Sequence, residues 1–173
     1  MTQSPPPQLS NQLTEHTKLL QKVAFISGDG GVARVLVLQR AEGEGSRPGC
    51  WDLPGGNAQW PTAIANIENP HLEAITREIA EETGVVVPET AFSQEQLVHV
   101  FTFFEQEKQV YTIYFGWYLR EVLSAGVPVV LEPSEHQAQR WVTLDEARAL
   151  NYGQAGGFVL TTIERAFVEC GCL

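Results

Sequence analysis

The apolar positions of this chain fall into short extended runs on either side of one strongly amphipathic segment. These runs are rich in aliphatic, β-branched and aromatic residues, and polar or glycine-containing stretches separate them. Strands are therefore expected, in chain order, at 19–26, 32–39, 51–53, 97–104, 110–119, 127–131 and 139–142, and residues 85–87 are expected to lead into another short extended segment. The stretches 41–49 and 57–68 predict surface loops.

The amphipathic segment predicts a helix over residues 70–83. Asn69 is a residue type that caps helices, Pro70 is favoured at the first helical position, and Gly84 is a typical stop. Within the segment one stripe of residues recurs at helical spacing and is expected to be buried; it consists of Leu72, Ile75, Ile79 and Thr83.

Two further helices are expected near the end of the chain. Thr143 and Glu146 have the spacing of a capping box, which opens a short helix. Residues 158–168 carry apolar side chains at helical spacing and predict a closing helix.

The order of these elements predicts the fold class and the domain organisation. Several strands with few helices and no strict strand–helix alternation favour an α+β fold. The polar, proline-rich residues 1–17 predict a disordered or extended tail. The length of the remainder, 18–173, predicts a single domain.

Composition narrows the partners and the cellular compartment. The net charge is −10 and no basic stripe is present, so duplex nucleic acid is not an expected partner. No apolar run reaches about 18 residues, so no membrane-spanning helix is expected. Cys50, Cys170 and Cys172 do not make a disulfide framework and predict reduced thiols in a cytoplasmic protein.

Three acidic residues converge on one face of the predicted helix. Glu78, Glu81 and Glu82 lie at positions i, i+3 and i+4, and like charges at this spacing cost about 0.2–0.5 kcal/mol per pair. A divalent cation that prefers oxygen ligands, Mg²⁺ or Mn²⁺, would compensate for this repulsion. Spacing alone also permits a solvated acidic face.

The sequence around these acids resembles the signature of the Nudix hydrolases, G-x5-E-x7-R-E-U-x-E-E-x-G-U, where U is a bulky aliphatic residue. Residues 77–85 match its second half without a gap, and Leu-Pro-Gly-Gly at 53–56 resembles its usual opening. The first half departs from the signature. Asn69 stands where the first Glu belongs, and twelve residues instead of five separate it from Gly56, which implies a seven-residue insertion. Glu68, one position earlier, is a candidate for the displaced Glu.

The resemblance implies an α/β/α sandwich with a mixed β-sheet between helices. It implies a metal-dependent pyrophosphohydrolase that cleaves a phosphoanhydride bond of a nucleoside diphosphate-linked substrate, such as a nucleoside triphosphate or a related pyrophosphate. The matching glutamates, Glu78, Glu81 and Glu82, would bind Mg²⁺ or Mn²⁺, and Arg77 would orient a carboxylate. The expected partner is a small-molecule nucleotide or pyrophosphate, and the expected assembly is a monomer or a homodimer.

A general base is needed to activate the attacking water. Glu81 or Glu82 can serve from within the helix. Glu135 is the preferred candidate, because its segment resembles the one before the last strand of many Nudix proteins. Glu105, on the turn between two strands, is its rival. The neighbouring His136 is expected to be a surface or packing residue.

Substrate contacts are expected from Arg40, Gly55, Gly56 and Trp60. Arg40 ends an apolar strand and can reach a phosphate. Gly55 and Gly56 have no Cβ, so their backbone can approach a metal or phosphate closely. Trp60 lies in the polar insertion, where it is a candidate to cover a nucleobase or to contact a second subunit.

Two other functions remain open from the sequence. One is a non-catalytic Nudix-fold module that binds a nucleotide or a protein, because the first half of the signature is degenerate. The other is an ordinary acidic α+β domain whose helix cluster is a coincidence.

Overall fold

The computed structural model describes residues 16–28, 31–59, 68–106, 108–125 and 129–172. The strands are β1 (Thr17–Ser27), β2 (Arg34–Arg40), β3 (Trp51–Asp52), β4 (Leu97–Glu105), β5 (Val110–Arg120) and β6 (His136–Val142). The α-helices are α1 (Pro70–Thr83), α2 (Leu144–Arg148) and α3 (Gly157–Glu169), and the short 3-10 helices are η2 (Glu89–Ala91) and η3 (Gln94–Gln96).

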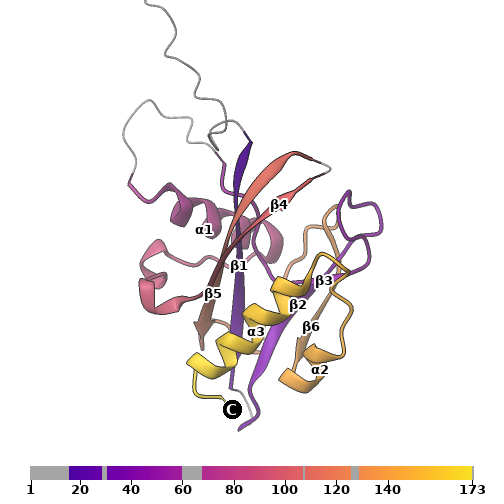
Figure 1. Cartoon of the computed structure of the whole chain (residues 1–173). Helices are drawn as coiled ribbons and strands as arrows, with labels where there is room; N and C mark the ends of the chain where they lie inside the picture. Colours follow the sequence, from indigo (N-terminus) through magenta and orange to yellow (C-terminus); the bar gives the residue numbers. More distant parts are fainter. Residues whose placement is uncertain (1–15, 29–30, 60–67, 107, 126–128, 173) are drawn as a thin grey trace, which may run out of the picture.

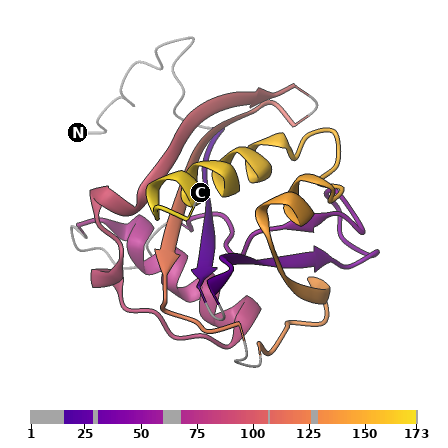
Figure 2. The same ribbon diagram turned by 90° about the horizontal axis from the view of Figure 1, so that it is seen from below.

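The strands form one mixed sheet in the order β3-β2-β1-β5-β4, with β6 paired to β2. β1 and β5 run parallel, whereas β2 pairs antiparallel with β1, β3 and β6, and β4 pairs antiparallel with β5. Helix α1 covers one face of the sheet, and α3 lies on the other (Figures 1 and 2). The predicted α+β class, with a mixed sheet between helices, is confirmed.

Alternation along the central strands gives each face of the sheet its own core. Val23 and Phe25 of β1 pack in the cluster that contains Ile75 and Ile79 of α1. Ala24 and Ile26, which alternate with them along β1, point to the opposite face of the sheet. There they form a second cluster with side chains of β2 and α3, which include Val35, Val37, Val159, Ile163 and Phe167. Helix α1 is therefore held by the apolar stripe that the sequence predicts, and its other faces remain available for chemistry.

The ends of α1 differ in how well the sequence predicts them. Gly84 adopts a left-handed conformation (φ 69°) and its N–H donates to the carbonyl of Ala80, as expected of a helix stop. Asn69 also adopts a left-handed conformation (φ 52°), and its side chain makes no capping hydrogen bond. The prediction of an Asn69 side-chain cap is therefore wrong, because capping by the side chain requires an extended backbone there.

Three other sequence-based expectations need correction or stay outside the described residues. Residues 85–87 follow α1 and belong to no strand. Residues 129–131 of the expected edge strand 127–131 also form no strand, and 127–128 lie outside the described residues. Cys170 and Cys172 are joined in a disulfide, so the prediction of reduced thiols is wrong for this pair, whereas Cys50 is a buried free thiol. None of the described helices is long and apolar enough to cross a membrane.

Glu105 at the end of β4 links the β4–β5 hairpin to the start of β1. Its carboxylate pairs with Lys18 and with Lys108 (3.1 Å) and accepts a hydrogen bond from Thr112 (2.9 Å). Partial burial alone would raise the pKa of Glu105, but the two lysines and Thr112 lower it to about 2. These contacts give the candidate base Glu105 a structural role.

We expect Glu105→Gln to destabilise the fold by about 1–2 kcal/mol at pH 7, a value reduced for solvent screening of partly exposed ion pairs. Because the pKa of Glu105 is depressed in the folded state, its contribution is complete above its ordinary pKa of 4.5. The contribution is lost as the pH falls towards 2. Urea unfolding from pH 7 to pH 2.5 measures this, with Glu42→Gln as an exposed control. A constant difference between Glu105→Gln and wild type across that range would contradict the assignment.

Candidate functional site

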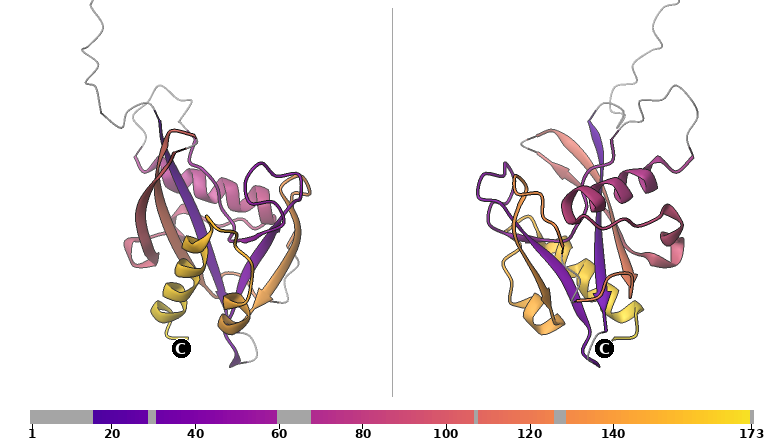
Figure 3. Two further views of the ribbon diagram at one scale, coloured as in Figure 1. Left: turned by 45° about the vertical axis from the view of Figure 1, so that its right-hand side comes forward. Right: turned by 180° about the vertical axis from the view of Figure 1, so that it is seen from behind.

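The site forms where the sheet opens between β1 and β2. These two strands pair only at Ile26 with Val35 and at Ser27 with Arg34, and then diverge (Figure 3). The segment 51–58 fills the opening. Its first residues pair with β2 as strand β3, and the residues that follow bond to β1 instead.

Pro54, Gly55 and Gly56, which we call the glycine corner, lie directly against β1. The Val23 N–H donates to the Pro54 carbonyl and the Gln21 N–H donates to the Gly56 carbonyl, each at 2.9 Å. Gly55 has a φ of 120°, and a Cβ there would overlap the Gln21 carbonyl oxygen. A Cβ on Gly56 would overlap the carboxylate of Glu78 on α1. Position 55 therefore requires glycine for the close approach of β1 and the corner, and Gly56 leaves room for the carboxylate of Glu78.

Glu82 is the deepest acid of α1. Its side chain is buried, and its Oε2 accepts a hydrogen bond of 2.6 Å from the Gly55 N–H. Burial raises the pKa of Glu82 to about 8, despite the opposing effects of nearby Lys22 and the Gly55 N–H. A buried carboxylate in this position favours a positive charge beside it.

The other two acids of α1 are held by Arg77. Its guanidinium bonds Glu78 Oε1 and Glu81 Oε2, each at 2.5 Å. Glu78 lies beside Gly56 and is largely buried, whereas the Glu81 side chain is 57% exposed. The structure thus directs Glu78 and Glu82 towards the glycine corner and Glu81 towards solvent, and Arg77 bridges Glu78 and Glu81.

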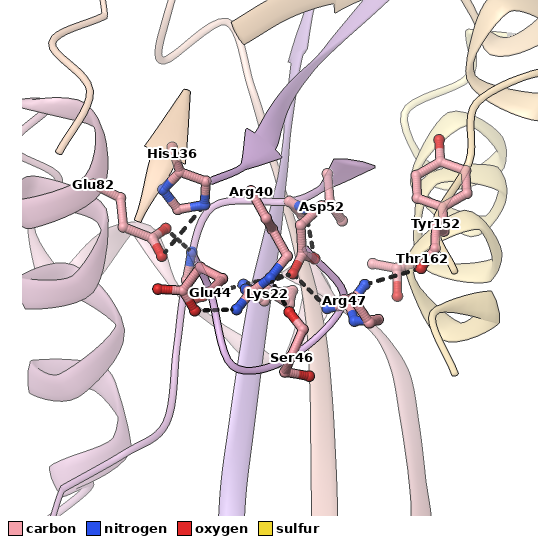
Figure 4. A network of polar contacts seen from close by, with 12 residues as sticks. Lys22, Arg40, Glu44, Ser46, Arg47, Asp52, Glu82, His136, Tyr152 and Thr162 are labelled. Carbon is pink, nitrogen blue, oxygen red and sulfur yellow. Dashed lines mark hydrogen bonds and ion pairs between the residues drawn. The ribbon is translucent and has the colours of Figure 1, made fainter. Parts of the chain in front are cut away.

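A cluster of cations faces these acids around the buried Asp52 (Figure 4). The Oδ2 atom of Asp52 lies 2.6 Å from Arg47, 3.3 Å from Lys22 and 3.5 Å from Arg40. Burial alone would raise the pKa of Asp52, but Lys22, Arg47, the Leu53 N–H and Arg40 hold it below its usual value. Asp52 therefore fixes three cations at the floor of the opening.

Glu135 and His136 enter the site from the start of β6. His136 pairs with Arg40 of β2, and the Ala41 N–H donates to the Glu135 carbonyl at 2.8 Å. Burial, followed by the charges of Glu78 and Glu44, raises the pKa of Glu135. Burial lowers the pKa of His136 to about 4, so its ring is neutral at pH 7.

Most of these groups line a cavity of about 380 Å³, although His136 is not among its lining residues. Its acids are Glu44, Asp52, Glu78, Glu82 and Glu135. Its cations are Lys18, Lys22, Arg40, Arg47 and Lys108. Five of the eleven lysines and arginines of an acidic chain therefore line one cavity, which suits an anionic ligand next to a cation-binding group.

The cavity contains most of the predicted site residues. Arg40, Gly55, Gly56, Glu78, Glu82 and Glu135 line it. Of the other described residues proposed from the sequence, Arg77 and Glu81 lie outside its lining, and so does the exposed Glu68. Trp60 lies outside the residues that the structure describes.

Four residues of the site were not predicted from the sequence, namely Lys22, Arg47, Asp52 and His136. Lys22 interrupts an apolar run, and Asp52 lies between Trp51 and Leu53. A charged residue within a predicted strand is unusual, and this feature could have marked both as site candidates. Nothing in the sequence distinguishes Arg47, because a cation in a polar loop is ordinary.

Glu82 and Glu135 of the cavity lining, together with the adjacent His136, form a donor set that fits a divalent cation. One ligand atom from each of Glu82, Glu135 and His136 lies within 4.8 Å of the other two. Neither ring nitrogen of the buried His136 has a hydrogen-bond partner, and the Glu82 carboxylate is nearly inaccessible to solvent. Glu78 adds a further carboxylate to the same cavity.

An apolar groove lies on the α3 side of Arg47. Its volume is about 500 Å³, and its aromatic lining includes Phe101, Phe103 and Phe158. The Arg47 guanidinium carbon lies 5.3 Å from the centroid of the Phe158 ring, while an Nη atom of the same residue bonds Asp52. Arg47 thus connects the polar cavity with the aromatic groove.

Comparisons with known proteins agree with this geometry. A family model described as the NUDIX domain matches residues 22–160. The MutT protein from Methanosarcina mazei Go1 has 24% sequence identity and a TM-score of 0.60, and the match covers 92% of this chain and 99% of that one.

Two other solved structures share the fold. The NUDIX domain of Shewanella oneidensis NrtR, in complex with ADP ribose, has 16% identity and a TM-score of 0.66, with 94% of each chain covered. A C. elegans Ap4A hydrolase in a binary complex has 20% identity and a TM-score of 0.54, covering 87% of this chain and 97% of that one. No curated protein sequence matches the chain.

Proposed function

The chain belongs to the Nudix domain family, and from that premise we propose that it is a metal-dependent hydrolase that cleaves a phosphoanhydride bond of a nucleoside diphosphate-linked substrate. One observation carries the proposal. Glu78 and Glu82 of α1 lie directly against the glycine corner and line the same cavity as the cations around Asp52. Such a cavity provides for both the metal and the polyphosphate.

The metal would be held by Glu78 and Glu82 of α1, with one carboxylate oxygen of Glu135, which directly precedes β6. When bound, a divalent cation lowers the pKa of water and screens the charge of phosphate oxygens. The Gly55 N–H fixes the Glu82 carboxylate through a 2.6 Å hydrogen bond. Arg77 restrains Glu78, so the donors on α1 are positioned before a ligand arrives.

Glu135 is suited to take the proton of the attacking water with its other carboxylate oxygen. It lines the cavity, and its raised pKa makes the carboxylate a stronger base than an exposed glutamate. As water attacks one phosphorus atom, its proton passes to Glu135 and the anhydride P–O bond breaks. Lys22 and Arg40 stand where they can neutralise oxygens of the phosphate chain.

The aromatic groove beyond Arg47 suits the part of the substrate that carries no phosphate. A nucleobase can stack on aromatic side chains such as Phe101 and Phe158, while the phosphates reach the polar cavity past Arg47. ADP ribose and Ap4A, named for two proteins of the same fold, both combine a base with linked phosphates. We therefore favour a small-molecule nucleotide over a simple pyrophosphate.

A substrate panel tests this function. Nucleoside triphosphates, ADP ribose, dinucleoside polyphosphates and inorganic pyrophosphate are incubated with the full chain and Mg²⁺ or Mn²⁺. We expect at least one nucleotide to be hydrolysed with release of phosphate or nucleotide, and the activity to disappear with excess chelator. Turnover of none of them with either ion would contradict the proposal.

A second candidate function is nucleotide binding without turnover. One observation favours it: Asn69 occupies the position of the first Glu of the signature, and the exposed Glu68 does not line the cavity among the described residues. Calorimetry separates the two functions. Tight nucleotide binding without product formation under either metal would favour the binding module. A cytoplasmic monomer or homodimer is proposed in both cases.

A further inference from the structure

His136 is unusual among the buried polar side chains of the described residues. The residue is 2% exposed, and neither Nδ1 nor Nε2 has a hydrogen-bond partner. Buried polar groups without a hydrogen-bond partner are costly and therefore rare in folded proteins. His99, the other buried histidine, satisfies this requirement, since its Nδ1 lies 3.0 Å from the Thr162 hydroxyl.

Two carboxylates, those of Glu82 and Glu135, lie close to the ring of His136. Its Nε2 lies 4.0 Å from Glu82 Oε1, which is too far for a hydrogen bond (Figure 4). Glu135 completes a group whose ligand atoms lie within 4.8 Å of one another. Donors bound at about 2.1 Å to one tetrahedral ion lie about 3.4 Å apart. Side-chain movements that draw the three ligand atoms together therefore bring all three onto one ion.

We propose that His136 donates a ring nitrogen to the cation held by Glu82 and Glu135, so that the site prefers first-row transition-metal ions to Mg²⁺. This inference rests on the proposed metal-dependent function and specifies its ion. Carboxylate oxygens and water suit Mg²⁺, whereas imidazole suits ions such as Co²⁺ and Zn²⁺. A buried nitrogen donor beside two carboxylates thus shifts the preference of the site away from Mg²⁺.

Pulsed electron paramagnetic resonance of bound Mn²⁺ tests the nitrogen ligand directly. The full chain is freed of metal with a chelator, loaded with Mn²⁺, and measured with natural and with ¹⁵N-labelled histidine. We expect the coupling of a directly coordinated imidazole nitrogen in the wild-type protein. The coupling should disappear in His136→Gln and persist in His16→Gln, which changes an exposed histidine.

Calorimetric titration tests the preference. We expect Co²⁺ to bind the wild-type protein more tightly than Mg²⁺ and His136→Gln to weaken Co²⁺ binding by roughly 10–100-fold. Mg²⁺ binding should change much less. Equal losses for both ions, or no loss for either, would contradict the inference.

The outcomes separate this inference from the proposed function. Bound Mn²⁺ without nitrogen coupling in the wild-type protein overturns the role of His136 and leaves the hydrolase proposal standing. No bound ion overturns both. If His136→Gln does not fold, the wild-type spectrum still decides, because His16, His71 and His99 are not in the described cluster with Glu82 and Glu135.

Discussion

Glu82→Gln is expected to lower kcat by roughly 10²–10⁴-fold, equivalent to several kcal/mol of transition-state stabilisation. The amide removes the negative charge that would hold the cation, although it keeps the size of the side chain and can still accept the Gly55 hydrogen bond. Because the carboxyl of Glu82 is buried and its pKa is raised, losing its charge does not destabilise the folded protein. Steady-state kinetics at saturating metal and substrate measure the effect.

Glu73→Gln is the matched control on the same helix. Glu73 is exposed and does not line the cavity among the described residues, so its substitution should leave kcat within about twofold of wild type. Undiminished activity of Glu82→Gln, in a preparation as pure and folded as the control, would exclude Glu82 from the metal site.

Gly55→Ala is expected to destabilise the protein by about 3–5 kcal/mol. Its φ of 120° is unfavourable for alanine, and the new methyl group would overlap the Gln21 carbonyl oxygen and approach Ile75 Cδ1 at 2.9 Å. Backbone cannot move aside there, since the corner is bonded to β1 on both sides of Gly55. The midpoint of urea unfolding, at constant m-value, measures the loss.

Gly56→Ala separates stability from activity at the neighbouring position. Its methyl group would meet the side chain of Glu78, and the nearest atoms belong to the carboxylate at its flexible end. The stability cost should stay below about 2 kcal/mol, while displacement of Glu78 lowers kcat by about a hundredfold. Gly45→Ala, with open space around its Cβ position, should change neither. Equal stability of the Gly55 and Gly45 variants would contradict the packing of the glycine corner.

The sequence predicts the fold well where local pattern and tertiary packing agree. Residues 70–83 form a helix because their apolar stripe matches the surface offered by Val23 and Phe25. The long strands β1, β2, β4 and β5 lie within a few residues of their predicted bounds. The short segment 85–87 is not a strand, since three apolar residues do not distinguish a strand from a loop.

The site was predictable only where its residues lie close together in the sequence. Glu78, Glu82 and the glycine corner are found through two short motifs. Asp52 and Lys22 meet because β2 diverges from β1, and that divergence leaves no trace in local periodicity. His136 was expected to be a surface or packing residue, and only the pairing of β6 with β2 places it beside Glu82.

The central claim is that α1 and the glycine corner bind a divalent cation for a polyphosphate. Anomalous scattering from crystals soaked in Mn²⁺, with and without a non-hydrolysable nucleotide, tests it most directly. We predict a Mn²⁺ peak in contact with Glu82 and beside Glu78 and the glycine corner. An ordered cavity with no such peak in either crystal would contradict the claim.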